Sequence, residues 1–230
     1  MAKIKIPWKP LLAVVLVLVL SWSGYVYYLN NIKIIPEELL AEVMQRTETT
    51  NSYRYHVKVT LLGTDTGNNV LSNLDGENSK DNFHIWGEMA KEQIEVFQVG
   101  NTTYAKRMED ARWMKTPGNN PFEQTLFMAE LNPLASFDFN SYSELEYLGK
   151  EKIDGKKLYL LTYQPKLGEE LLTMYFTDFK YKIWVDRGRR EIRHAQIEAT
   201  SKISSKGGLK MEVKIWDYNK PIEIKPPEDS

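Results

Sequence analysis

The chain of 230 residues contains no cysteine. This absence excludes disulfide bonds, thiol catalysis, thiolate metal sites and lipidation on cysteine. A domain built from this sequence must therefore be stabilised by packing alone, even if it is exported from the cell.

An excess of charge of one sign is also lacking. The chain has 30 lysine and arginine residues against 31 aspartate and glutamate residues, for a formal net charge of −1. Because no broad basic field is present, the composition does not indicate a nucleic-acid partner.

Motifs for catalysis and for cofactors are missing as well. The sequence has no G-x-S-x-G, no P-loop and no G-x-G-x-x-G. His56, His84 and His194 fall on the polar phase of three different predicted strands, which is typical of solvated side chains rather than of a zinc site. We therefore expect no metal, no cofactor and no enzymatic activity. An enzyme is the weakest alternative, since it would need a cleft with an acid or a histidine of perturbed pKa.

What the sequence does have is one long apolar run. Leu11 to Leu29 carries no charged side chain, and three lysines precede it: Lys3, Lys5 and Lys9. A helix needs about 20 apolar residues to cross the hydrocarbon of a bilayer, whereas the apolar core of a cleaved signal peptide has only about 7–15. The length favours an uncleaved signal anchor at 11–29, with cleavage after Ser23 as the alternative.

The flanks of this run predict its orientation. Its end carries the tyrosines of an aromatic belt, as found where a helix leaves the membrane: Tyr25, Tyr27 and Tyr28. Only Lys33 closely follows the run, so the positive-inside rule places residues 1–10 in the cytosol. We expect a single-pass protein of the cell membrane, in which a linker at 30–35 leads to an extracytoplasmic domain.

The pattern changes after this linker. Pro36 to Thr49 predicts a short amphipathic helix, with a proline and two acids in its first turn. Apolar and polar residues then alternate from Tyr53 to Leu61, which predicts a half-buried strand. Further short alternating segments follow, separated by turns of a few residues such as the predicted hairpin turn Asp154-Gly155, so neighbouring strands are expected to pair antiparallel.

Two helical segments interrupt these strands, at 122–137, where Pro133 ends or kinks the helix, and at 167–176. A meander of nine to eleven strands with one apolar face must curl or close. The expected fold class is mainly antiparallel β with short helices (α+β). It forms a strongly curved, half-open β-barrel over 36–220, capped by helices, and a tail rich in proline and acids follows at 221–230.

The tryptophans depart from the alternation. Trp86, Trp184 and Trp216 lie opposite the most regular apolar phase of their strands. Such positions predict either that both faces of the sheet are partly covered or that one surface contacts lipid or a partner.

Three segments together carry a resemblance to a known family. They are "SYRYHVKV" at 52–59, "IEVFQVGNTTYAK" at 94–106, and "KIWVDRGRREIRHAQI" at 182–197. With the helix that precedes them, they resemble the bacterial LolA-like superfamily, which includes lipoprotein carriers and the LppX/LprG-type lipoproteins. The likeness covers residues 36–220. Its most specific part is Ile183 to Ile197.

The resemblance implies an unclosed barrel whose apolar cavity takes acyl chains, in a protein that shields or senses lipid or lipidated protein. The implied cavity residues are the apolar strand phases: Tyr55, Val57, Val59, Phe83, Ile85, Ile94, Val96, Tyr104, Leu158, Leu160, Val213 and Ile215. The implied lid residues are Leu126, Phe127, Met128 and Leu131.

One departure from the family changes the expected mode of action. LppX/LprG-type members carry a lipidated cysteine after the signal peptide, and "VLSWSG" at 19–24 ends without one. The helix at 11–29 would then replace the lipid as the tether, which favours local transfer or sensing over long-range carriage.

Two functions follow as hypotheses. The first is a membrane-anchored, extracytoplasmic lipid- or lipoprotein-binding protein with an apolar cavity. The alternative is a protein-interaction or envelope-stress sensory module with a packed interior. The expected partners are the membrane, a lipid or acylated protein, and, for the alternative, another protein.

Overall fold

The computed structural model describes residues 8–27, 33–64, 67–80, 82–107, 109–110, 112–117, 128–137, 139, 141–167 and 171–228. These residues belong to two compact units, Met1–Ile35 and Pro36–Ser230. We call the second one the sheet unit.

The first unit contains one helix, α1 (Trp8–Tyr27). Its described side chains, from Leu12 to Tyr25, are all exposed. Within the part of the chain that the structure describes, no helix combines the length and apolarity needed to cross a membrane. The last residues of the predicted anchor, 28–29, lie outside the described ranges.

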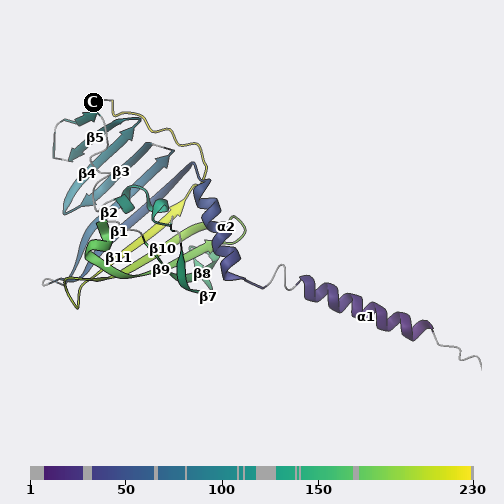
Figure 1. The fold of residues 1–230 in the computed structure, drawn as a ribbon. Helices are drawn as coiled ribbons and strands as arrows, with labels where there is room; N and C mark the ends of the chain where they lie inside the picture. The colour runs from purple at the N-terminus through teal and green to yellow at the C-terminus, as the bar shows by residue number, and fades with distance from the viewer. Residues whose placement is uncertain are drawn as a thin grey trace, which may run out of the picture. The chain divides into compact units, whose positions relative to one another are not determined.

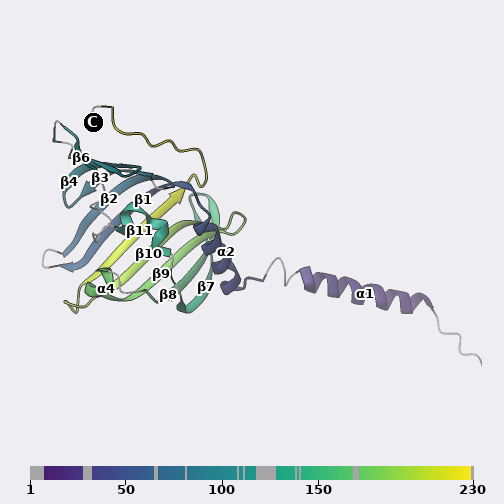
Figure 2. The same cartoon turned by 45° about the horizontal axis from the view of Figure 1, so that its top comes forward.

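The sheet unit is built on one antiparallel sheet of eleven strands, in the order β6-β5-β4-β3-β2-β1-β11-β10-β9-β8-β7. Figures 1 and 2 show the sheet strongly curved, with β6 and β7 as its two end strands. The strands are β1 (Ser52–Thr64), β2 (Gly67–Ser79), β3 (Asn82–Met89), β4 (Glu92–Val99), β5 (Thr102–Arg107), β6 (Met114–Pro117), β7 (Tyr142–Ile153), β8 (Lys156–Pro165), β9 (Phe176–Asp186), β10 (Glu191–Ser201) and β11 (Gly208–Trp216). The prediction of a curved, unclosed, mainly antiparallel sheet with few short helices is confirmed.

The alternation of apolar residues corresponds to the two faces of this sheet. Residues that pair directly across neighbouring strands point to the same face. Val57 pairs with Val213 on β11 and with Leu74 on β2, and all three side chains are fully buried or nearly so. We call the face that carries them the helix-covered face, and the opposite one the outer face.

Short helices cover the first of these faces (Figure 2). They are α2 (Pro36–Glu48), α3 (Met128–Leu131), the 3-10 helix η3 (Pro133–Phe137) and α4 (Leu171–Tyr175). The buried hydroxyl of Tyr55 donates a hydrogen bond to the carbonyl oxygen of Leu131 over 2.9 Å. The ring of Phe137 meets that of Tyr181 edge-on. Both contacts fix α3 and η3 against the sheet.

Helix α2 is held by burial and by charge. It buries Leu39, Leu40 and Val43, as the predicted apolar stripe requires. On its outer side, Nε of Arg190 lies 2.9 Å from Oε2 of Glu42. Because that ion pair is about half exposed, packing contributes more to the position of α2 than charge does.

Sequence reasoning missed strand β2. Its segment, "GNNVLSNLDGENS", is rich in asparagine, glycine and serine, which ordinarily indicate a loop. It nevertheless pairs along its length with β1 and β3. Gly76 shows why a glycine suits this strand, since a Cβ there would lie 2.2 Å from Cζ of the Tyr55 ring. Pairing with β1 and β3, rather than the intrinsic β propensity of the segment, therefore explains why β2 is a strand.

Two signals that are local in the sequence agree with the structure. Asp154 and Gly155, predicted to form a hairpin turn, both have positive φ, of 50° and 80°, as a type I′ turn requires. Helix α3 ends at Leu131 and η3 begins at Pro133, which agrees with the predicted break at that proline.

Candidate functional site

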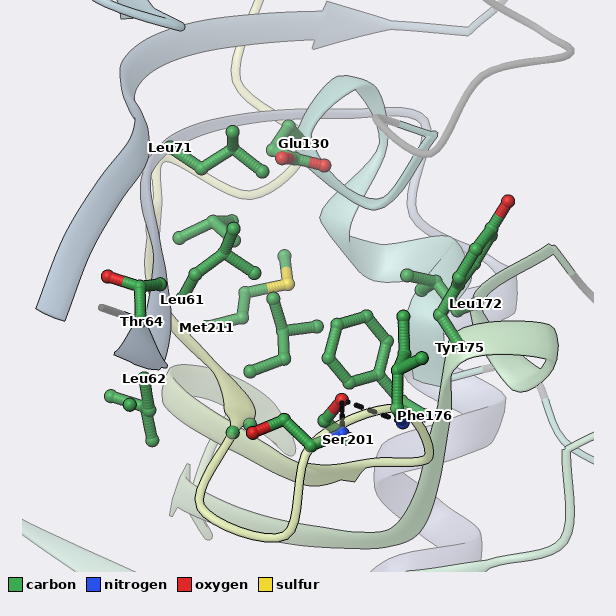
Figure 3. Close-up of a pocket in the computed structure, with 17 residues that line it drawn as sticks. Leu61, Leu62, Thr64, Leu71, Glu130, Leu172, Tyr175, Phe176, Ser201 and Met211 are labelled. Atoms are coloured by element: carbon green, nitrogen blue, oxygen red, sulfur yellow. Dashed lines mark hydrogen bonds between the residues drawn. The ribbon is translucent and has the colours of Figure 1, made fainter. Parts of the chain in front are cut away.

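A cavity of about 590 Å³ opens on the helix-covered face, beside the end of β1 and the start of β11 (Figure 3). Strands, helices α3 and α4, and the 203–207 turn all contribute to its wall. Most lining side chains are apolar: Val59, Leu61, Leu62, Leu71, Leu172, Tyr175, Phe176, Ile203, Leu209 and Met211. Such a wall can exclude water from a long apolar ligand.

The close approach of two backbone segments shapes one side of the cavity. Gly63, near the end of β1, has a φ of +62°, and a Cβ there would lie 2.0 Å from the carbonyl oxygen of Lys206. Only glycine tolerates both this conformation and this contact. The 203–207 turn can therefore lie against β1 and bring Ile203 to the cavity wall.

Helix α4 borders the other side. The backbone N–H of Lys202 donates to the carbonyl oxygen of Tyr175 over 2.8 Å. The Nζ of Lys202 donates to the carbonyl oxygen of Thr173. These bonds hold the end of α4 to the turn after β10, so that Leu172 and Phe176 line the cavity (Figure 3).

One acid interrupts this apolar lining. Among the described residues that line the cavity, Glu130 of α3 is the only one with a charged side chain. It is 3% exposed, and its Oε1 accepts a hydrogen bond from the hydroxyl of Ser72 over 3.1 Å. Burial disfavours the charged form and raises the pKa of Glu130 to about 7, although hydrogen bonds from its own backbone N–H and from Ser72 oppose this shift.

Nine of the predicted cavity residues share the helix-covered face. The ladder pairs, with alternation along each strand, place them there: Tyr55, Val57, Val59, Phe83, Ile85, Ile94, Val96, Val213 and Ile215. Eight of them are buried and Ile94 is half-buried. Only Val59 lines the 590 Å³ cavity. The others form packed core beside it or lie elsewhere on the same face.

The other three predicted residues point to the outer face. Tyr104 pairs with Phe97, whose ring stacks on His84, and Leu160 pairs with Trp184. Leu158 lies two residues before Leu160 on β8 and therefore points to the same face. In β8 the run "LYLLTY" contains adjacent leucines, so its phase cannot be read from alternation. Pairing with β9 selects Leu161 and Tyr163 for the helix-covered face: they pair with Ile183 and Tyr181.

The predicted lid is only partly within the described residues. Leu126 and Phe127 lie outside them, as does the side chain of Met128. Leu131 is in α3 and is 2% exposed. Of the described side chains in this segment, that of Glu130 lines the cavity.

Much of the true lining could have been found from the sequence. Leu61, Leu209 and Met211 continue the alternating phases that contain Val59 and Val213. Leu172 and Tyr175 belong to the predicted helix at 167–176. Glu130 had a weaker signal, as a lone acid in the apolar run "LFMAEL". Nothing local shows that this acid is buried.

The outer face is polar between its tryptophans. Trp86 and Trp184 lie on it, on β3 and β9, and paired residues of the intervening strands separate them: Asp75, His56, Lys214 and His194. Trp216 lies on the same face, opposite Arg54. Each histidine lies near a carboxylate: His56 near Asp75, His84 near Glu95 and His194 near Asp154. The tryptophans therefore do not make one continuous aromatic patch.

The curved, unclosed sheet and the apolar cavity beneath short helices define the class of fold. It is the fold of LprF and LppX, and LppX is one of the lipoproteins that the sequence resemblance named. No protein-family model matches the chain, and no curated protein does.

Solved structures share this fold. LprF from Mycobacterium bovis is 14% identical, with a TM-score of 0.55 over 84% of this chain and 96% of that one. The lipoprotein LppX from Mycobacterium tuberculosis is 16% identical, with a TM-score of 0.51 over 82% of this chain and 99% of that one. At such identities the likeness shows the fold.

Proposed function

We propose that the protein binds the acyl chains of a lipid or lipidated protein in the 590 Å³ cavity, on the extracytoplasmic side of a membrane to which residues 11–29 anchor it. The observation that carries this proposal is the cavity itself. It has the size of a ligand site, and its mainly apolar lining contains a single charged side chain among the residues that the structure describes.

Burial of methylene groups supplies the affinity in this proposal. Each methylene moved from water into an apolar site contributes about 0.8 kcal/mol, so a stretch of about eight contributes roughly 6 kcal/mol. Association and ordering of the chain oppose this gain. The net binding free energy is smaller than the gain from burial, and a moderate affinity of this kind suits a protein that takes up an acyl chain and releases it again nearby.

The sheet unit is suited to a direct test. All eleven strands and the helices that cover them lie within Pro36–Ser230, so residues 34–230 keep the whole core. This piece is purified without detergent and analysed by native mass spectrometry and by organic extraction. We expect an added mass that extracts as lipid.

A matched pair of variants links the bound mass to the cavity. Leu61→Trp places an indole in the cavity and is expected to abolish the added mass. Leu148→Trp makes the same change on β7, where Leu148 is 51% exposed, and should leave it unchanged. A wild-type piece that stays free of lipid, even after incubation with bacterial lipids, would refute the binding proposal and favour the protein-interaction alternative.

Anchoring is a separate part of the proposal and rests on the apolar sequence 11–29 with its three preceding lysines. We expect the full chain to resist extraction from membranes by alkaline carbonate, and the sheet unit to be open to protease added outside the cell. Leu18→Arg should weaken membrane retention, because a charge at the centre of a span costs about 2.5–3.5 kcal/mol. Leu148→Arg is the control. Complete extraction of the wild-type chain by carbonate would refute the anchor.

A further inference from the structure

Among the described residues that line the cavity, one carries a carboxyl group, and that residue is Glu130. Oε1 of Glu130 is occupied by the hydroxyl of Ser72. Figure 3 shows the carboxyl group at the margin of the cavity, beside Leu71. A ligand placed in the cavity meets the Glu130 carboxyl as its only acidic partner among the described residues that line it.

None of the described residues that line the cavity with Glu130 carries a positive charge. From β2 it faces Ser72, and from β1 it faces Tyr55, whose own pKa burial raises well above its usual value. Tyr175 of α4 lines the cavity further away. Lys202 and Lys206 are exposed on the nearby turn and do not line the cavity. Glu130 is thus the one carboxyl group among the described residues that line the cavity, and it has no cation beside it there.

An ionised carboxylate without a cation is unfavourable in such a site, whereas the protonated acid offers a hydroxyl donor. The carboxylate of a fatty acid would add a second negative charge beside Glu130, and two such groups cannot both stay ionised at low cost. An ester carbonyl is neutral and accepts a hydrogen bond from the protonated acid.

We propose that Glu130 selects neutral acyl esters over free fatty-acid anions, by donating a hydrogen bond from its protonated carboxyl to the ester carbonyl in the cavity. This inference rests on the proposed function and assigns a polar contact to the same site. It makes ligand uptake dependent on pH, with binding strongest in mildly acidic surroundings and release favoured as the pH rises above neutral.

The test uses two fluorescent probes of equal chain length: a pyrene-labelled fatty-acid methyl ester and the corresponding free acid. Their affinities for residues 34–230 are measured from pH 5.5 to 8.5. For the wild type we expect the ester to bind about tenfold more weakly at pH 8.5 than at pH 5.5, the size expected for one lost hydrogen bond. The acid should bind more weakly than the ester at pH 8.5.

Glu130→Gln separates the role of the proton from that of the cavity. The amide donates a hydrogen bond at every pH, so ester binding should become independent of pH, and the preference over the acid at pH 8.5 should shrink. Glu146→Gln, at an exposed position on β7, should behave as the wild type does. A second measurement needs no variant: the infrared carbonyl band of a 13C-labelled ester should shift to lower frequency when bound at pH 5.5 and should lose that shift at pH 8.5.

The outcomes distinguish this inference from the proposed function. Ester binding that changes by less than twofold across the pH range, or a pH response that persists in Glu130→Gln, refutes the role of Glu130 and leaves acyl binding intact. Failure of both probes to bind at any pH, in the wild type as in the variant, refutes acyl binding itself and the role of Glu130 with it.

Discussion

Replacing Glu130 by glutamine is expected to stabilise the protein above pH 7 and to leave its stability nearly unchanged at pH 4. The carboxyl is 3% exposed, and its pKa rises from an ordinary 4.5 to about 7 when the chain folds. Between pH 4.5 and about pH 7, the Glu130 carboxyl therefore keeps its proton in the folded state, whereas it has lost that proton in the unfolded chain. Stability must fall as the pH rises through this window, because the unfolded state binds fewer protons there.

The size of the effect follows from the shift in pKa. A difference of about 2.5 units at about 1.36 kcal/mol per unit corresponds to roughly 3 kcal/mol of lost stability above pH 7. Glutamine carries no titrating group, and its carbonyl oxygen can still accept the bond from Ser72. The variant should thus gain up to about 3 kcal/mol over the wild type at pH 8, and the gain should shrink towards zero as the pH falls to 4.5.

Urea unfolding of residues 34–230 at pH 4.5, 6, 7 and 8 measures this difference. Other carboxyl groups also titrate in this range, so the informative quantity is the free-energy difference between variant and wild type at each pH. Glu146→Gln, exposed on β7, should show almost no difference at any pH. A variant that is less stable than the wild type at pH 8, or a difference that does not depend on pH, would refute the account of Glu130 as a buried, destabilised acid.

Three further predictions concern the core and the cavity. Gly76→Ala should lower the free energy of unfolding by roughly 1–3 kcal/mol, because its Cβ would lie 2.2 Å from the ring of Tyr55; Gly188→Ala, which meets ordinary contacts, is the control, and equal effects would contradict the prediction. Tyr55→Phe removes the 2.9 Å hydrogen bond to Leu131 and should cost about 1–3 kcal/mol in urea unfolding, whereas Tyr142→Phe, at an exposed position, should cost little. Affinity for a series of alkyl esters should rise about fourfold per methylene until the cavity is filled; calorimetry showing no dependence on chain length would argue against an apolar binding site.

The likeness to LppX and LprF concerns the fold, and the ligand preference has to come from the side chains of this chain. The nine predicted residues on the helix-covered face illustrate the difference. Alternation identified them correctly as one face, yet only Val59 reaches the cavity. Whether a buried face becomes packed core or cavity wall depends on what the helices leave uncovered, and no local pattern encodes that.

Adjacent strands explain the remaining errors. The segment that forms β2 has the composition of a loop, but β1 and β3 leave a row of backbone donors and acceptors that it satisfies. In β8 either of two adjacent leucines could face inward, and the pairing of Leu161 with Ile183 decides. On β5, Ala105 pairs with Val96 and so points to the helix-covered face. Its neighbour Tyr104 must then point to the outer face.

The sequence by itself determined what depends on neighbouring residues along the chain. The alternation of apolar and polar residues predicted the strands. The Asp154-Gly155 pair predicted a hairpin turn, and Pro133 predicted the end of a helix. The absence of cysteine excluded disulfide bonds and a lipid tether on sulfur. Only the tertiary structure decided which face the helices cover, where the cavity opens and that Glu130 is buried in its wall. The physical reason is that burial and register are set by contacts between residues far apart in the sequence, such as Ser72 with Glu130 and Tyr55 with Leu131.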